Sequence, residues 1–508
     1  MPDPSLLYDQ TTIRSIERAA LAAHPPGTLM QRAGAASAEM ALRLIREANS
    51  SDPVLILAGP GNNGGDALVA AACLLRAGVP VLVLLQADPA KQPVDAHQAL
   101  QHARSNGVDM LGIDRWQECL GRRWSLIIDG LFGIGLTRPI DGATAALIHA
   151  LNDVDCPLLA LDVPSGLDAD TGNIVGPHGV AVRASHTITF IGNKPGLHTA
   201  DGADHAGQVE VAPLDLDDSF FPGATISLNG LSHFSHCLRP RKRNSHKGSF
   251  GDLTIVGGAH GMAGAAILAA RAGAKAGAGR VFAAFLDTPP AYDALQPELM
   301  CRPAQLHAFS NGVLVAGPGL GTKDDAADVL ARVLKTTLPL VLDADALNLL
   351  ASDATLRQLL VARSAPAVMT PHPLEAARLL STGSTNIQAD RISAARRLAA
   401  SFNSIVALKG AGSVLARQDG LAVINTTGNP GLATAGTGDV LAGICGALLA
   451  QGWPAWEAAL ASVWLHGRAA DVLVQRGIGP VGLTASELIP EVRQLMNDLT
   501  AQPANRAC

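Results

Sequence analysis

Short, continuous apolar segments recur along the chain and alternate with stretches of helical pattern. In the first half these segments cover residues 54–59, 79–85, 126–129, 158–162 and 186–190. In the second half they cover residues 253–256, 280–284, 312–316, 338–343, 367–370 and 405–408. Continuous apolarity, as opposed to alternation, is typical of strands that are buried on both faces. The pattern therefore predicts an α/β protein built on parallel sheets with helices on either side.

The strand pattern lapses between about Pro213 and Lys247, where Asp, Ser, Pro and Gly are frequent. A basic run from Arg239 to Lys247 ends this stretch, and it favours a solvated linker over a segment that touches ligand phosphates. The chain of 508 residues is also about three times the length of a typical domain of roughly 150. We place a domain boundary here, with one domain over residues 1–225 and a second over residues 226–508.

Composition and charge exclude several classes of protein. With 48% hydrophobic and 16% charged residues the chain is too apolar to be disordered. Only 3% of residues are aromatic and the net charge is −6, which argues against a nucleic-acid partner and against a membrane-interface belt. The most apolar stretch, residues 440–463, is interrupted by Gln451, Pro454 and Glu457, which indicates two core helices and no membrane span.

Seven cysteines are scattered along the chain and none forms a Cys-x-x-Cys pair. An odd, scattered set is typical of reduced thiols in the cytoplasm, and the N-terminal residues lack the pattern of a signal peptide. We therefore expect a cytoplasmic protein without a thiol-based metal site.

A glycine-rich turn follows the first predicted strand. Gly59-Pro-Gly-Asn-Asn-Gly-Gly-Asp66 contains Gly-x-Gly-x-x-Gly between that strand and a helical stretch from Ala67, as the dinucleotide-binding fingerprint requires. Asp88, after the next strand, stands where a ribose-binding acid could lie. An NAD-dependent dehydrogenase is one interpretation of this turn, and tight helix packing without a ligand is another.

Two further strands in this half end in an aspartate. Asp129 and Asp162 each open a loop that contains glycine, and Ser165 follows Asp162 closely. In a doubly wound sheet such positions lie at the carboxyl edge, where ligands bind. We therefore expect Asn63, Asp129, Asp162 and Ser165 to converge. Oxygen ligands without His or Cys favour a hard cation over zinc.

Three motifs together resemble the NAD(P)H-hydrate epimerase family, also called the YjeF N-terminal family. They are Gly59-Pro-Gly-Asn-Asn-Gly-Gly-Asp66, Asp129-Gly-Leu-Phe-Gly-Ile-Gly-Leu-Thr-Arg-Pro139 and Leu161-Asp-Val-Pro-Ser-Gly166. The resemblance implies a Rossmann-like doubly wound domain that interconverts the R and S epimers of hydrated NAD(P)H. Asp162 would move a proton beside the reacting carbon, and Asn63, Asp129 and Ser165 would bind potassium.

The resemblance also implies a set of substrate-binding residues in this half. They are Asn62, Asn63, Gly64, Gly65, Asp66, Gly133, Ile134, Gly135, Leu136, Thr137, Arg138, Pro139 and Asp162. Asp88 has no comparable role in that family, so we expect it to be a surface acid at a strand end.

The most informative segment of the second half runs from Asn425 to Val440. It is a loop of small residues that opens directly into a helical stretch. Consecutive backbone N–H groups from Ala435 to Asp439 at a helix N-terminus would form an anion hole for a transferring phosphoryl group. Asp439 is placed to accept a hydroxyl proton, although an acid here can also simply complement the helix dipole. No Gly-x-x-x-x-Gly-Lys-[Ser/Thr] occurs, so the chain is not a P-loop NTPase.

Other strand ends in this half carry polar or glycine-rich loops. Gly257–Ala265, Gly317–Gly321 and Lys409–Ser413 each follow a predicted strand and allow close approach of a ligand. The acids of residues 342–348 could support magnesium through water. His372 lies between two prolines, and a substrate contact and a structural role are equally compatible with that position.

These motifs resemble the ADP/ATP-dependent NAD(P)H-hydrate dehydratase family, a ribokinase-like branch. The resemblance rests on Gly-Thr-Gly-Asp439, Thr-Pro-His-Pro373, Asp-Ala-Asp-Ala-Leu-Asn348 and an Asn-Pro-Gly segment, while Leu374 stands where the family usually has Gly. It implies a ribokinase-like α/β domain that phosphorylates the hydroxyl of the hydrate and then eliminates phosphate, with ADP or ATP and magnesium. The residues expected to bind ADP are Lys409, Gly410, Ala411, Gly412, Ser413 and Gly438. Those expected to bind the hydrate are Ala263, Gly319, His372 and Asp439, with Asp439 as the base.

The two resemblances together imply a bifunctional enzyme that repairs hydrated NADH and NADPH, with ADP favoured over ATP, and we expect a homo-oligomer. Two alternatives stay open at this point. A small-molecule kinase with a nucleotide-binding N-terminal module would release a stable phosphorylated product. An N-terminal scaffold module without catalysis would show no epimerase rate.

Overall fold

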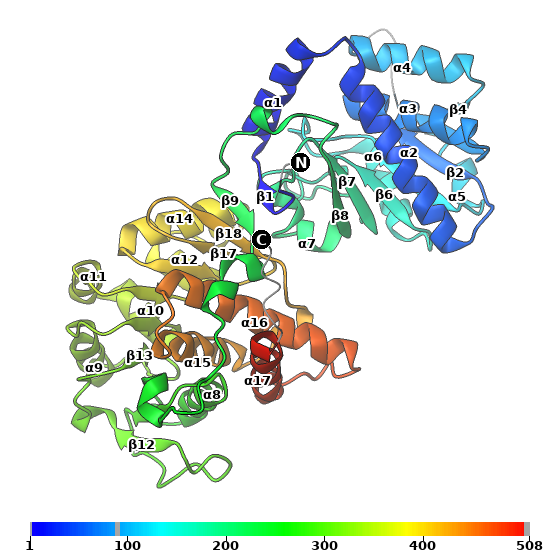
Figure 1. Ribbon diagram of the computed structural model, residues 1–508. Coiled ribbons are helices and arrows are strands. Elements are labelled where there is room, and N and C mark those ends of the chain that lie inside the picture. Colours follow the sequence, from blue (N-terminus) through cyan, green and yellow to red (C-terminus); the bar gives the residue numbers. More distant parts are fainter. Residues whose placement is uncertain (1–2, 87–91, 502–508) are drawn as a thin grey trace. The chain divides into compact units, whose positions relative to one another are not determined.

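The computed structural model describes residues 3–86 and 92–501, so Asp88 lies outside the described residues. The chain divides into two compact units, Met1–Ser227 and Leu228–Cys508 (Figure 1). Each unit is an α/β domain with its own sheet, which confirms the predicted fold class.

The first unit is built on seven parallel strands in the order β4-β3-β2-β5-β6-β7-β8. Their bounds are β2 Val54–Ala58, β3 Val81–Leu85, β4 Asp109–Gly112, β5 Leu126–Gly130, β6 Leu158–Leu161, β7 His186–Phe190 and β8 Gln208–Ala212. The chain moves from β2 outward through β3 to β4 and then returns to the other side of β2 as β5. The sheet therefore has a topological switch point between β2 and β5, the place where doubly wound sheets bind ligands.

Helices cover both faces of this sheet. They are α1 Gln10–Ala23, α2 Thr28–Ala48, α3 Asn62–Arg76, α4 Val94–Ser105, α5 Gln117–Leu120, α6 Gly142–Asn152 and α7 Gly202–His205. Val54, Ile56 and Ala58 of β2 belong to the core under α2–α4, while Leu55 and Leu57 belong to the core under α5 and α6. Burial on both faces explains why β2 is continuously apolar.

The second unit contains a larger sheet in the order β18-β17-β16-β15-β14-β13-β10-β11-β12. The bounds are β10 Asp252–Gly257, β11 Arg280–Phe285, β12 Met300–Pro303, β13 Val313–Ala316, β14 Leu340–Leu342, β15 Ala367–Met369, β16 Ile405–Leu408, β17 Ser413–Ala416 and β18 Ala422–Asn425. The pairs that join β10 to β16 are all parallel, whereas β16 pairs antiparallel with β17 and β17 pairs antiparallel with β18. Near the boundary of the units, the short β1 (Leu6–Leu7) pairs antiparallel with β9 (Ile226–Leu228).

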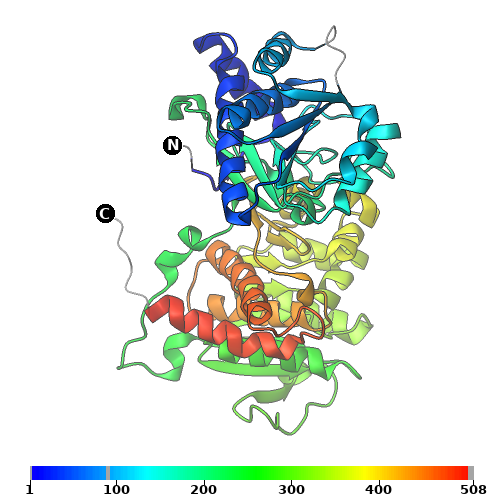
Figure 2. The same ribbon diagram turned by 90° about the vertical axis from the view of Figure 1, so that its right-hand side faces the viewer.

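The helices of this unit are α8 Ala263–Lys275, α9 Asp324–Leu334, α10 Ala344–Ser352, α11 Ala354–Val361, α12 Pro373–Leu379, α13 Ser384–Ala389, α14 Arg391–Phe402, α15 Thr437–Ala450, α16 Ala455–Gln475 and α17 Ala485–Ala501. The core joins the sheet to α8, α15, α16 and α17, and α16 and α17 lie side by side (Figure 2). The apolar stretch 440–463 thus belongs to two core helices, as predicted. Over the described parts of the chain, no helix is long and apolar enough to cross a membrane.

The structure differs from the sequence prediction in three places. Strands β4, β8 and β12 were not predicted, because their residues are partly exposed and lack a continuous apolar run. The short strands β1, β9, β17 and β18 were not predicted either, although β17 and β18 are largely buried. The sheet of the second unit is not purely parallel, because β16 turns back into the β17–β18 hairpin. Helix α3 begins at Asn62, five residues before the expected start, so most of the glycine-rich turn belongs to the first turns of a helix.

The contact of α8 with α15 yields a stability prediction. A Cβ atom at Gly443 of α15 would lie 2.1 Å from the carbonyl oxygen of Ala269 in α8, while a Cβ at Gly264 of α8 has no described neighbour within 4 Å. Gly443→Ala should therefore lower the free energy of unfolding of the second unit by about 1–3 kcal/mol. The matched Gly264→Ala should leave it unchanged or raise it slightly, by about 0.5–1 kcal/mol. Calorimetric unfolding of both variants checks this, and equal stabilities would contradict the packing described.

Candidate active sites

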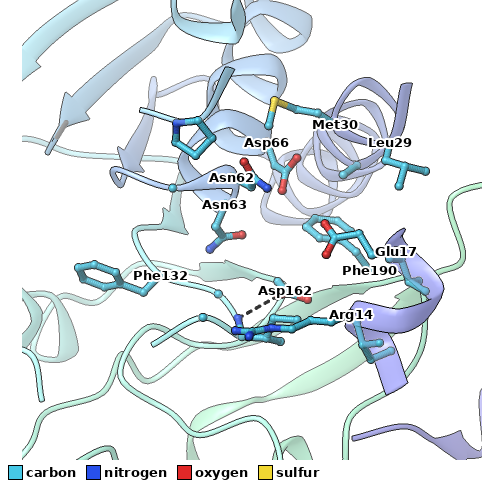
Figure 3. A pocket seen from close by; sticks show the side chains of 18 of the residues that line it. Arg14, Glu17, Leu29, Met30, Asn62, Asn63, Asp66, Phe132, Asp162 and Phe190 are labelled. Atoms are coloured by element: carbon cyan, nitrogen blue, oxygen red, sulfur yellow. Dashed lines mark hydrogen bonds between the residues drawn. The ribbon is translucent and has the colours of Figure 1, made fainter. Parts of the chain in front are cut away.

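A cavity of about 520 Å³ opens at the switch point of the first unit, at the carboxyl ends of β2, β5 and β6 (Figure 3). Most of the substrate-binding residues expected from the sequence line it. These are Asn62, Asn63, Asp66, Gly133, Ile134, Gly135, Leu136, Thr137, Arg138 and Asp162. The N-terminus of α3 and the loop after β5 therefore face each other across one cavity, as the strand-end positions predicted.

Three of the expected residues are not among those that line the cavity. Gly64 lies against the backbone, since a Cβ there would be 2.0 Å from the carbonyl oxygen of Gly59. Gly65 packs against Met30, since a Cβ on Gly65 would lie 2.6 Å from Met30 Cε. Pro139 packs against Gly176. In the structure these residues allow close packing around the cavity wall.

Asp162 is held in an unusual backbone conformation at the end of β6. Its φ of 66° lies in the left-handed region, which few residues other than glycine adopt. The Nζ atom of Lys194 donates to Oδ1 at 2.6 Å, and the backbone N–H of Ile134 donates to Oδ2 at 3.2 Å. The Asp162 carboxylate is thus anchored on one oxygen by a cation and held more weakly on the other.

Besides Asp162, the acids Glu17, Asp66 and Asp95 and the cations Arg14 and Arg138 line the same cavity. Burial, followed by the charge of Asp162, raises the pKa of both Glu17 and Asp66, and the rise at Asp66 is large. Arg14, on the same helix as Glu17, also lines the wall. Sequence reasoning missed Arg14, Glu17 and Lys194. The helical spacing of three between Arg14 and Glu17 was the available signal for the first two, because it puts both on one face of α1.

Asp129 and Ser165 form a buried pair and are absent from the cavity lining. The Ser165 hydroxyl donates to Asp129 Oδ1 at 2.7 Å and its backbone N–H donates to Oδ2 at 2.8 Å. Burial raises the pKa of Asp129 to about 6, partly offset by these hydrogen bonds and by one from Leu131. Asn63 donates to the carbonyl of Leu161, while its own buried Oδ1 has no hydrogen-bond partner among the described residues.

In the second unit a buried carboxylate joins three adjacent strand ends. Asp343, which follows β14, accepts hydrogen bonds from Lys409 Nζ at 2.7 Å and from the Thr370 hydroxyl at 2.8 Å. Gly438, in the first turn of α15, lies against this pair, since a Cβ there would be 3.3 Å from Lys409 Nζ. The loop of small residues thus approaches Asp343 and Lys409 directly.

Charges at this edge act on one another. Burial, then the charge of Asp343, raises the pKa of Asp439 to about 6. Burial alone would lower the pKa of Lys409, but Asp343, Glu375 and Asp439 together raise it above its ordinary value. Asp439, with its raised pKa, lies at a helix N-terminus and interacts with the ammonium group of Lys409. This arrangement suits removal of a proton next to a bound phosphate.

His372 caps the N-terminus of α12, a structural role that the sequence could not distinguish from a substrate contact. Its Nδ1 accepts from the backbone N–H groups of Leu374 and Glu375 at the start of α12, and Glu375 accepts in return from the His372 backbone N–H. Burial lowers the pKa of His372, and burial raises the pKa of Glu375 to about 7. Leu374, which departs from the family pattern, lies in the first turn of α12 and is 47% exposed, so its side chain meets no steric conflict.

The remaining expected residues lie on two loops of this edge. Gly319, with φ of 58°, touches Met262 and Ala265, which flank Ala263 and Gly264 at the start of α8. The turn Gly410, Ala411, Gly412 and Ser413 joins β16 to β17. Arg391 was not predicted from the sequence. Its buried guanidinium donates to the carbonyls of Leu408 and Lys409 and lies against Gly410, so it stabilises this turn.

Comparisons with known proteins cover both units. Residues 26–196 match the model of the YjeF-related protein N-terminus, and residues 253–493 match that of NAD(P)H-hydrate dehydratase. A bifunctional NAD(P)H-hydrate repair enzyme from Coxiella burnetii is 37% identical over 97% of this chain and 100% of its own length. The chain belongs to this family of bifunctional NAD(P)H-hydrate repair enzymes.

Single-domain relatives of the repair enzyme family match the second unit alone. An ADP-dependent (S)-NAD(P)H-hydrate dehydratase from Neisseria meningitidis is 48% identical over 53% of this chain and 92% of its own length. A solved ADP/ATP-dependent NAD(P)H-hydrate dehydratase from Bacillus subtilis, co-crystallised with ATP and Mg²⁺, is 27% identical. It covers 53% of this chain and 97% of its own, with a TM-score of 0.48.

The pair Asp343–Lys409 yields a second prediction. The Asp343 side chain is only 2% exposed, so Lys409→Met would leave a buried carboxylate without its cation. Such a change usually costs about 3–5 kcal/mol, whereas Lys335→Met, at an exposed lysine, should stay within about 0.5 kcal/mol. Adding Asp343→Asn to Lys409→Met should recover part of the loss. Urea unfolding measures all three variants, and a stable Lys409→Met would show that the ion pair contributes little.

Proposed function

We propose that the two units are the two enzymes of one repair activity. The first unit interconverts the R and S epimers of hydrated NAD(P)H, and the second dehydrates the S epimer at the expense of ADP or ATP, which restores NAD(P)H. The observation that carries this proposal is the presence of both family regions in one chain, each with an acid, Asp162 or Asp439, at the carboxyl edge of its sheet. A dehydratase that accepts one epimer needs an epimerase for the other, so the fusion is chemically coherent.

In the first unit, we assign the proton transfer to Asp162. Its Oδ2 receives one backbone N–H at 3.2 Å and its side chain keeps 13% exposure toward the cavity. The N-terminus of α3 and the backbone of residues 133–138 would bind the phosphates of the substrate, since helix N-termini and glycine-rich backbone favour anions. A carboxylate within reach of the hydroxyl can take its proton, which lets the ring C–N bond of the hemiaminal break to give an aldehyde. Closure of the nitrogen onto the other face of that aldehyde, with return of the proton to the oxygen, gives the other epimer.

In the second unit, we assign the base to Asp439 and the phosphoryl-binding anion hole to the first turn of α15. Lys409 and the turn 410–413 would meet the nucleotide, and Gly438 lets its phosphates approach the helix N-terminus. Ala263, Gly319 and His372 would contact the hydrate. The nucleotide requires magnesium, which Asp343 and Asp345 at the neighbouring strand end would support through water. Asp439 takes the proton of the hydroxyl that becomes phosphorylated.

The direct test uses the purified full-length chain with an equal mixture of R and S hydrated NADPH and either ADP or ATP. The proposal expects the absorbance of dihydronicotinamide to return for the whole mixture, with equimolar inorganic phosphate. A kinase would instead accumulate a phosphorylated product without that absorbance. A first unit without catalysis would leave the R epimer behind beyond its spontaneous conversion. The preference for ADP, the cytoplasmic location and the homo-oligomeric state stay predictions.

Asp439→Asn tests the dehydratase assignment. Because a general base usually contributes about 10²–10⁴-fold, the variant should lose about 99% or more of the dehydration rate while epimerisation continues unchanged. In the wild type the rate should also fall as the pH drops below about 6, because protonated Asp439 cannot accept a proton. Rates at several pH values with the S epimer check both points. A variant that retains more than about a tenth of the rate would refute the role of Asp439.

Asp162→Asn tests the epimerase assignment. The S epimer should still be dehydrated at the normal rate, because Asp439 and Lys409 are untouched, whereas the R epimer should disappear only as fast as it converts spontaneously. Chiral separation of the remaining substrate follows both epimers through the reaction. Consumption of the R epimer at the wild-type rate would rule out proton transfer by Asp162.

We further propose that potassium binds at Asn63, Asp129 and Ser165. Two observations fit a cation: Oδ1 of Asn63 is buried without a hydrogen-bond partner, and among the described residues no cationic side chain pairs with the fully buried carboxylate of Asp129. Amide, carboxylate and hydroxyl oxygens with a total charge of −1 suit a large monovalent ion better than magnesium. Potassium would neutralise Asp129 and hold the N-terminus of α3 near the loop after β5.

Potassium should consequently raise both the melting temperature and the epimerase rate. The protein is first dialysed against a bulky organic cation, then titrated with potassium chloride, with the chloride salt of the organic cation as the ionic-strength control. Asp129→Ala should remove the response and weaken substrate binding more than it unfolds the unit. If neither quantity responds and Asp129→Ala behaves like the wild type, Asp129 and Ser165 only stabilise the loops.

A further inference from the structure

Lys194 follows β7 and is fully buried, with its side chain 0% exposed. Its ammonium group donates to Asp162 Oδ1 at 2.6 Å, to the hydroxyl of Thr189 at 2.7 Å and to the carbonyl of Phe190 at 2.8 Å. An ammonium has three protons, so every donor is used. A lysine that is buried this completely is rare unless a carboxylate compensates its charge, and here that carboxylate is Asp162.

The arrangement makes the two oxygens of Asp162 unequal. Oδ1 is bound by a cation that three acceptors hold in place, whereas Oδ2 receives only the Ile134 N–H at 3.2 Å and lies beside the Gly133 backbone at the cavity wall. The left-handed φ of 66° at Asp162 must be stabilised by its surroundings. One contribution is a hydrogen bond from the backbone N–H of Asp162 to the carbonyl of Ile188 in β7. Lys194 therefore determines where the side chain points and which oxygen is left for chemistry.

We infer that Lys194 is a positioning residue of the epimerase, which holds Oδ1 of Asp162 and aims its Oδ2 at the substrate. This inference rests on the proposed epimerase function. It assigns no proton transfer to Lys194 itself, because the three acceptors occupy all of its protons and the side chain does not reach the cavity surface.

The surrounding charges make the lysine necessary. Glu17 from α1 and Asp66 from α3 share the cavity with Asp162, and each interacts with it electrostatically. Two neighbouring acids disfavour a third negative charge. Arg14 of α1 also faces the cavity, but no ion pair joins it to Asp162 in the described structure. Without Lys194, Asp162 would lose the cation that contacts Oδ1 and fixes its side chain.

Lys194→Met should therefore lower kcat for epimerisation by about 10²-fold, because a misplaced catalytic group costs this much, while KM changes little. A loss confined to kcat separates a misplaced carboxylate from weaker substrate binding. Arg43→Met is the matched control, because Arg43 pairs with Glu210 on the exposed surface of the same unit. It should leave kcat and KM unchanged, and the dehydratase rate reports that the second unit is intact in both variants.

A melting-temperature cycle tests the pair without any substrate. In the wild-type background, Lys194→Met should lower the melting temperature of the first unit, because the Asp162 carboxylate loses its counter-ion. The same change should raise it in the Asp162→Asn background, where the buried ammonium has already lost its counter-ion. If Lys194→Met does not fold, Lys194→Gln, which keeps a donor for Thr189 and Phe190 without the charge, replaces it in both experiments.

Either of two results would overturn the inference: a folded Lys194 variant with wild-type kcat, or an equal loss of melting temperature in both backgrounds. A wild-type protein that does not epimerise at all would contradict the proposed function instead, and the melting cycle would still decide whether the pair is coupled.

Discussion

An ion pair between a lysine and an aspartate, with at least one of the two side chains buried, lies at the carboxyl ends of parallel strands in both units and positions both candidate sites. In the first unit Lys194, after β7, binds Asp162, after the adjacent β6. In the second, Lys409, after β16, binds Asp343, after β14, and Thr370 from the strand between them donates to the same carboxylate. A buried charge must be compensated, so each pair fixes the spacing of neighbouring strand ends, and the loops that carry the substrate contacts depart from those ends.

The two pairs place their carboxylates differently. Asp162 itself lines the cavity, and its lysine lies behind it, away from solvent. Asp343 is buried, and its lysine is the partner that reaches toward the loop of small residues, close to Gly438. In the first unit the pair therefore presents an anion to the substrate, which suits proton transfer. In the second it presents a cation beside a helix N-terminus, which suits phosphate, and the base that we propose there is a separate residue, Asp439.

The sequence predicted much of this architecture for a physical reason. Strands buried on both faces must be continuously apolar, so β2, β5, β6 and β10 were evident, and the residue after such a strand lies at the edge where ligands bind. Asp129, Asp162 and the loop before α15 were therefore found from the sequence. The strands β4 and β8 were not, because their residues are half exposed and their pattern matches that of loops.

Residues that hold the candidate site residues in place were harder to predict from the sequence than the site residues themselves. Lys194 and Arg391 are ordinary cations in the sequence, and only the fold shows that both are buried beneath a functional loop. Gly64 and Gly65 were expected to bind the substrate; the structure packs them against Gly59 and Met30, and binding of a ligand by their backbone stays a prediction. Asp88 lies outside the described residues, so its expected place on the surface stays a prediction.

The central claim is that each unit carries one complete and independent reaction, and complementation tests it most directly. Asp162→Asn protein retains only the dehydratase and Asp439→Asn protein only the epimerase. Either variant alone should restore NADPH slowly or incompletely from an equal mixture of R and S hydrate with ADP. The two variants mixed in equal amounts should restore all of it at a rate near that of the wild type, because the S epimer diffuses between molecules. A mixture that recovers only the S half would contradict the account.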